Sequence, residues 1–149
     1  MGKDILAPDG SLDRKKLAEI VFSDPKRLRI LEAIIHPAIE KLRKHKSAIL
    51  RERGHKVAVY MAPLIFETNL NKELDKVILI TAKPDIAMKR AQIRDLLTEV
   101  EIQKRIDQQL DEQSKIKMAD YVIENNSSFD ELFQKVAMAW KKLTGFALS

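Results

Sequence analysis

Three arginines, Arg90, Arg94 and Arg105, could do chemistry, because they fall on two predicted helices that lie between two predicted strands. Basic side chains on a mobile helical lid can close over phosphate groups and neutralise the charge that moves in phosphoryl transfer. The alternative interpretation is ordinary pairing with acidic neighbours on exposed helix surfaces. The acidic neighbours available for such pairing are Glu99, Glu101 and Asp107. Both interpretations remain open from the pattern alone.

Other catalytic chemistries find little support in these 149 residues. The four glycines stand at positions 2, 10, 54 and 145, so none has the spacing of a phosphate-binding P-loop. No serine or cysteine nucleophile lies beside a histidine. The absence of cysteine excludes disulfide bonds and thiolate zinc sites. The histidines are isolated from carboxylate clusters, so no metal site is predicted.

The composition indicates a globular chain, with 45% hydrophobic and 33% charged residues, and its length suggests a single domain. From residue 14 to 56 there are thirteen Lys/Arg against five Asp/Glu, a local net charge of +8. This excess favours an anionic partner, although a solvated helix face gives the same pattern. Few aromatic residues are interleaved, so no nucleic-acid partner is predicted. Without a long apolar run or signal-like segment, we expect no membrane span and a cytoplasmic location.

The first 55 residues are predicted to be helical. Asp13 is a candidate cap for a helix to about residue 22, and Ser23 or Asp24 for the next, with Pro25 in its first turn. The pair at 36–37 is expected to interrupt that second helix, because proline disfavours helical geometry in the preceding residue. The helix should resume and end near Gly54.

The remaining residues alternate between strand and helix patterns. Strands are predicted over 57–62, 76–82 and 120–124. Helices are predicted from Pro84 to about 94, from the capping box at Thr98 to about 110, and from Ser128 to near the end of the chain. This alternation is typical of an α/β protein with a parallel sheet of about three strands, covered on both faces by helices.

Several runs resemble the dephospho-CoA kinase family, the P-loop kinases that complete coenzyme A synthesis, in the family's order and spacing. The runs are GKDIL, PDGSLDRKKLAEIVFSDP, LEAIIHPAI, APLIFETNLNKELDKVILI, RAQIRDLLT, RIDQQ and KMADYVIENN. The resemblance implies an incomplete P-loop-kinase-like fold. Its expected parts are a helical substrate-binding region (1–55), a strand–helix core (56–95), lid-like helices (96–118), and a last strand with its helix (119–149).

The resemblance implies two groups of nucleotide-binding residues. Arg94, Arg105 and Gln109 match lid positions that would face the phosphates of ATP, and Asn125 matches a turn that lies against adenine. ATP and Mg²⁺ are therefore the expected cofactors.

The resemblance also implies where dephospho-CoA would bind. Asp13, Arg14 and His36 match the helical substrate region, and Pro63 and Glu67 match a loop near the substrate. The partner expected from this match is a small nucleotide substrate.

The chain also departs from the family pattern. The family's glycine-rich phosphate loop and catalytic aspartate would precede the position at which these 149 residues begin. Met61 stands where the family has an acid, and a thioether cannot accept hydrogen bonds from Mg²⁺-bound water as a carboxylate can. Ser127 stands where glycine is common, so a positive φ would be harder to adopt there.

These departures shape the functional expectations. The family transfers the γ-phosphoryl group of ATP to the 3′-hydroxyl of dephospho-CoA, but without a P-loop we expect the isolated chain to be inactive. The alternatives are a degenerate coenzyme A or nucleotide-binding module, or a truncated fragment that assembles with another chain. Because a central strand would be missing, we expect either direct pairing of 57–62 with 76–82 or a homo-oligomer that fills the gap.

Overall fold

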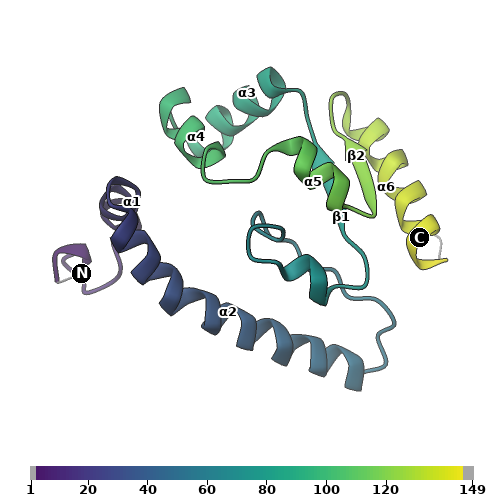
Figure 1. Ribbon diagram of the computed structural model, residues 1–149, viewed down its shortest axis with the longest axis horizontal. Coiled ribbons are helices and arrows are strands. Elements are labelled where there is room, and N and C mark those ends of the chain that lie inside the picture. Colours follow the sequence, from purple (N-terminus) through teal and green to yellow (C-terminus); the bar gives the residue numbers. More distant parts are fainter. Residues whose placement is uncertain (1–2, 146–149) are drawn as a thin grey trace. The chain divides into compact units, whose positions relative to one another are not determined.

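The computed structural model describes residues 3–145 and divides the chain into two compact units, Met1–Val59 and Tyr60–Ser149. The described part is mostly helical and contains a parallel pair of strands (Figure 1). None of its helices is both long and apolar enough to cross a membrane.

The first unit is built on α1 (Arg14–Ser23) and α2 (Pro25–Glu52), which follow a short 3-10 helix, η1 (Lys3–Ile5). The predicted Asp13 cap is confirmed, and of the two candidates for the second helix, Ser23 and Asp24, the cap is Asp24. The Asp13 carboxylate accepts hydrogen bonds from the first backbone N–H groups of α1, and Asp24 accepts one from the N–H of Lys26 in α2. These acceptors satisfy donors that a helix start leaves without partners. The helices contact each other, and Val21 is buried.

The expected interruption at His36 and Pro37 is wrong, because α2 runs through both residues. Proline lacks an N–H, so the carbonyl four residues earlier loses its helical hydrogen bond. Residues with good helix propensity lie on both sides, and one lost bond costs less than ending and restarting a helix. The end of α2 follows the prediction: Arg53 caps the helix, and Gly54 adopts the left-handed φ that favours glycine.

The second unit contains the sheet, in which β1 (Ile78–Thr81) pairs in parallel with β2 (Tyr121–Glu124). The crossover between them holds α3 (Pro84–Asp95), α4 (Glu99–Ile106) and α5 (Glu112–Met118), and α6 (Phe129–Thr144) follows β2. Helix α5 contacts β1 and α6 contacts β2 (Figure 1). Two of the predicted strands are therefore confirmed. Val77, just before β1, and Ile123, within β2, are buried.

The third predicted strand, over 57–62, is not formed. This segment has no strand partner among residues 3–145, and Val59 and Met61 are exposed. Strand propensity measures how side chains fit a pleated surface, so it has no effect without a neighbouring strand. Direct pairing of 57–62 with 76–82 is therefore wrong, and pairing with a second chain stays a prediction. The expectation that both sheet faces are covered is also wrong, since Ile78 and Ile80 are exposed.

The loop after this segment turns into η2 (Leu70–Glu73), and one predicted helix is shorter than expected. Helix α4 ends at Ile106, not near residue 110, because Asp111 caps the separate helix α5 by accepting the Ser114 N–H at 2.9 Å. Residues 107–111 form the junction between these helices.

Asp120, just before β2, forms hydrogen bonds with the residues just before β1. Its carboxylate accepts hydrogen bonds from Lys76 Nζ at 2.9 Å and from the Val77 N–H at 2.8 Å. The bond from Lys76, followed by that from Val77, lowers the pKa of Asp120 below its ordinary value of 3.8. A carboxylate with a lowered pKa in the folded state stabilises the fold above its unfolded pKa, and the contribution disappears as the pH falls through the folded pKa.

We therefore expect Asp120→Asn to lower the melting temperature at pH 7 and to have little effect at pH 2–3. Thermal unfolding followed by circular dichroism across this pH range measures the difference. Asp130→Asn removes an exposed carboxylate from the same unit and is the matched control. An equal loss for Asp120→Asn at both ends of the range would contradict the assignment.

Candidate functional site

The two predicted lid arginines lie at one carboxylate, that of Asp95 at the end of α3. Arg94 donates to it from Nε at 2.8 Å and from Nη2 at 2.9 Å. Arg105 of α4 places its Nη1 at 3.5 Å from Asp95 Oδ2. The bond from Arg94 is the main cause that lowers the pKa of Asp95, and the charge of Arg105 adds to it. The helices thus gather two exposed guanidinium groups, a group type that binds phosphate oxygens bidentately.

The joint between α3 and α4 holds this cluster in place. Leu96 caps α3 with a left-handed φ of 53°. Thr98 and Glu101 then form the predicted capping box at the start of α4, with the Thr98 N–H donating to Glu101 at 2.8 Å. The Leu96 cap and the capping box form between residues close in sequence. They turn the chain so that Arg94 and Arg105 both reach Asp95.

Arg90 does not share this carboxylate but fixes the turn that follows β2. Its Nη1 donates to the carbonyl of Asn125 at 2.6 Å, and its Nη2 to that of Ser127 at 3.3 Å. The Asn125 N–H donates to the carbonyl of Thr81 at 2.7 Å. Among the described residues, Ser127 is not one of those with positive φ, so the turn forms without the glycine that the family pattern favours. The predicted adenine turn is therefore well anchored.

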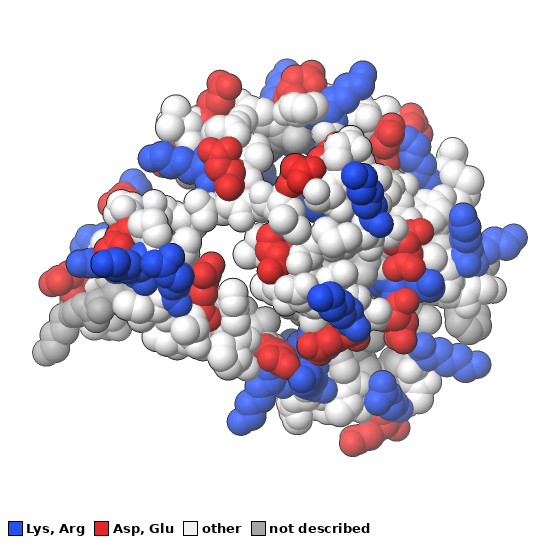
Figure 2. Space-filling model, in the orientation of Figure 1, with Lys and Arg blue, Asp and Glu red and all other residues white. Residues whose placement is uncertain are grey.

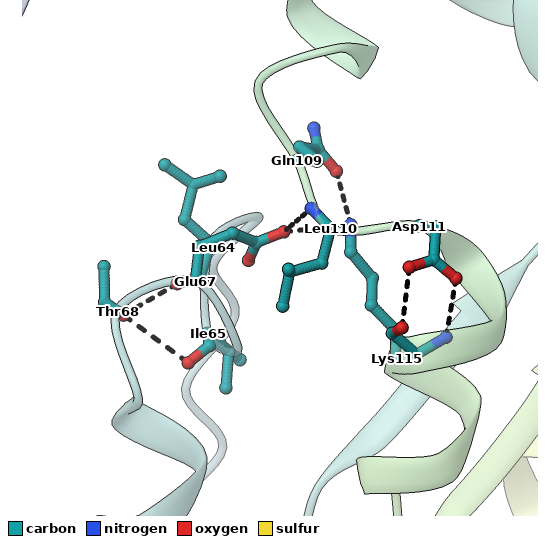
Figure 3. Close-up of polar contacts among 9 residues, drawn as sticks. Leu64, Ile65, Glu67, Thr68, Gln109, Leu110, Asp111 and Lys115 are labelled. Carbon is teal, nitrogen blue, oxygen red and sulfur yellow. Dashed lines mark hydrogen bonds and ion pairs between the residues drawn. The ribbon is translucent and has the colours of Figure 1, made fainter.

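A third polar group lies in the loop after residue 60. Glu67 Oε1 accepts the Leu110 N–H at 2.9 Å and lies 3.2 Å from Lys115 Nζ, which also donates to Gln109 Oε1 at 2.7 Å (Figure 3). Burial raises the pKa of Glu67, but hydrogen bonds from its own backbone, from Leu110 and from Lys115 outweigh burial and lower it. Glu67 and Gln109, predicted from different parts of the resemblance, are thus brought together.

The other predicted residues are placed separately. Asp13 and Arg14 start α1, and His36 is exposed on α2, all in the first unit. Pro63 is exposed at the start of the turn that carries Glu67. Acidic and basic side chains intermingle on the visible face, without one large patch of a single sign (Figure 2).

Sequence reasoning missed two residues, Asp95 and Lys115. Asp95 directly follows Arg94, so its adjacency was a usable signal. Lys115 gave no signal, because its partner Glu67 lies far away in the sequence.

Comparisons with known proteins agree on one family. The sequence model of a family described as Dephospho-CoA kinase matches residues 1–131. The dephospho-CoA kinase of Geobacter sulfurreducens is 37% identical over 141 residues, which cover 95% of this chain and 72% of that protein. That of Listeria innocua is 37% identical over 135 residues, covering 91% and 68%.

Two solved structures are similar to this chain, and one of them is a dephospho-CoA kinase. A dephospho-CoA kinase from Campylobacter jejuni is similar with a TM-score of 0.64 and 32% identity, over 97% of this chain and 72% of that one. A crystal structure of a Thermus thermophilus protein is similar with a TM-score of 0.69 and 32% identity, covering 94% and 72%.

The parallel strand pair, the arginine-bearing crossover helices and these matches place the chain among the phosphotransferase families. Within that class, the chain belongs to the dephospho-CoA kinase family. The resemblance seen in the sequence is confirmed. The chain spans about 70% of the length of the relatives named above.

The family implies ATP and Mg²⁺. The described residues include groups suited to the phosphates of ATP but no cluster suited to a metal ion. The guanidinium groups of Arg94 and Arg105 suit the phosphates of ATP. For a cation, residues 3–145 contain no group of three or more His, Cys, Asp or Glu side chains able to hold a metal ion.

Proposed function

We propose that this chain supplies the lid, the adenine turn and the substrate-binding helices for ATP-dependent phosphorylation of the 3′-hydroxyl of dephospho-CoA in the cytoplasm. The observation that carries the proposal is the convergence of Arg94 and Arg105 on Asp95. In the reaction the bond from the γ-phosphorus to its bridging oxygen breaks, a bond to the 3′-oxygen forms, and ADP leaves. The hydroxyl proton passes to a carboxylate base, the role that the family pattern gives to its catalytic aspartate.

The assigned residues have distinct roles in this proposal. Arg94 and Arg105 stabilise negative charge on the phosphates and do not act as acid or base, because guanidinium groups keep their protons. Gln109 belongs to the lid, and Asn125 lies against adenine. The substrate residues are Asp13, Arg14, His36, Pro63 and Glu67.

These 149 residues alone are expected to show no turnover. They contain no P-loop to bind the β-phosphate through backbone N–H groups or to bring a lysine to the γ-phosphate. ADP release in the presence of ATP, Mg²⁺ and dephospho-CoA measures this directly. Turnover by the 149 residues would contradict the expectation, and activity gained by joining a P-loop segment ahead of residue 1 would support it.

The alternative function is a coenzyme A or nucleotide-binding module without catalysis, which could act as a partner subunit. The basic stretch from residue 14 to 56, with its local net charge of +8, favours it. Salt-dependent binding of coenzyme A, with no turnover even after a P-loop segment is joined, would select this alternative. Light scattering would decide whether the chain forms a homo-oligomer.

A further inference from the structure

Glu67 lies on a turn that is closed by its own hydrogen bonds. Thr68 Oγ1 donates to the Leu64 carbonyl at 2.7 Å, and the Leu70 N–H donates to the Ile65 carbonyl at 2.9 Å. Phe66, the neighbour of Glu67, is buried. The bonds that Thr68 donates lie on one side of the close-up in Figure 3, with the Glu67 carboxylate directed away from the turn toward Leu110. The turn therefore offers a fixed anion to the residues opposite.

The residues opposite form the junction 107–111 between α4 and α5. The Gln109 N–H donates to the Ile106 carbonyl at 2.9 Å, which continues the last turn of α4. Lys115 of α5 contacts both Gln109 and Glu67. The carboxylate thus binds the junction through the Leu110 N–H and binds α5 through Lys115, just beyond the helix that carries Arg105.

The pair is largely removed from water, with the Glu67 side chain 15% exposed and the Lys115 side chain 12% exposed. Glu67 Oε2 is buried and has no hydrogen-bond partner among the described residues. A buried pair with an unsatisfied oxygen is a poor source of stability, since desolvation offsets the attraction. Its geometry is better suited to fixing one element against another.

We propose that Glu67 and Lys115 are positioning residues that fasten the α4–α5 junction to the turn at 63–69 and so set the direction of α4 and of Arg105. Neither residue acts on the reacting atoms. The consequence for phosphate binding rests on the proposed function of Arg105, whereas the mechanical link does not.

The test combines amide hydrogen exchange with binding of a fluorescent ATP analogue to the 149-residue chain. In Glu67→Gln we expect exchange at Leu110 and through residues 99–109 to rise by about tenfold, because the junction opens locally. Exchange in β1 and β2 should stay unchanged. Analogue affinity should fall while its dependence on salt is kept, since both arginines remain. Lys115→Met should change exchange and affinity in the same way as Glu67→Gln. Lys115→Arg should keep the slow exchange of the unchanged chain.

Glu131→Gln is the matched control, because it neutralises another glutamate that pairs with a lysine, Lys135 at 2.6 Å, in the same unit. The proposal is overturned if Glu67→Gln and Glu131→Gln give the same exchange over residues 99–111. If Glu67→Gln does not fold, the double variant Glu67→Gln/Lys115→Met leaves no unpaired charge and is read in the same way. Arg105→Gln separates the two claims: an unchanged analogue affinity in this variant refutes the proposed function, while exchange at Leu110 still tests the link.

Discussion

Replacing both Arg94 and Arg105 by glutamine is expected to weaken ATP binding by about 100-fold, because each lost charge-assisted hydrogen bond is worth roughly 1.5 kcal/mol. Each single variant should lose about tenfold. The dependence of affinity on salt should also become shallower, since fewer charges meet the phosphates. Titration with a fluorescent ATP analogue at several salt concentrations measures both quantities.

Lys104→Gln is the control for this prediction. It removes a positive charge from the exposed surface of the same helix, next to Arg105 but outside the contacts of Asp95. Asp95→Asn should change the affinity for the ATP analogue in the opposite direction. It releases both guanidinium groups and should therefore raise this affinity several-fold. If the double arginine variant binds as Lys104→Gln does, the arginine cluster is not the phosphate site.

Replacing Ile123 by alanine is expected to lower the free energy of unfolding by about 3 kcal/mol, as for other large apolar residues removed from a packed core. The side chain is only 2% exposed, in the strand that β1 pairs with. Few residues of the second unit are as fully buried, so little packing can compensate. Urea unfolding followed by circular dichroism gives the change.

The matched substitution is Ile78→Ala in β1. Ile78 is 40% exposed, so removing the same atoms should cost about 1 kcal/mol or less. Equal losses for the two alanine variants would show that the interior of the sheet is not where the structure places it.

Local signals in the sequence were reliable for helix starts. Asp13, Thr98 and Ser128 cap helices as predicted, and of the two candidates for α2, Ser23 and Asp24, the cap is Asp24. The start of α5 at Asp111 was not predicted. A cap needs only a side-chain acceptor and an N–H two or three residues away, so the neighbouring sequence contains all the information.

Predictions that depended on distant partners fared worse. The segment 57–62 has the composition of a strand, but forming one needs a neighbour that the local pattern does not reveal. At Pro37, the local preference against a helix was overridden by the helix-forming residues on both sides.

The candidate site shows the same division. Arg94, Arg105 and Gln109 were located by family resemblance, whereas composition and spacing identified only a set of arginines. The role of Asp95 as their shared partner depends on the turn at Leu96, whose left-handed backbone is unusual for leucine. Lys115 could be assigned to Glu67 only once the chain was folded.

Asp95 has a further consequence for the kind of anion that α3 and α4 accept. Two guanidinium groups and one carboxylate carry a net charge of +1, so the cluster attracts anions only weakly at a distance. A chloride ion gains too little to displace a bidentate carboxylate, whereas a triphosphate can engage both guanidinium groups at once. We therefore expect the cluster to bind polyphosphates in preference to small monovalent anions such as chloride. The low net charge should slow association, but simple salts should compete less for the site.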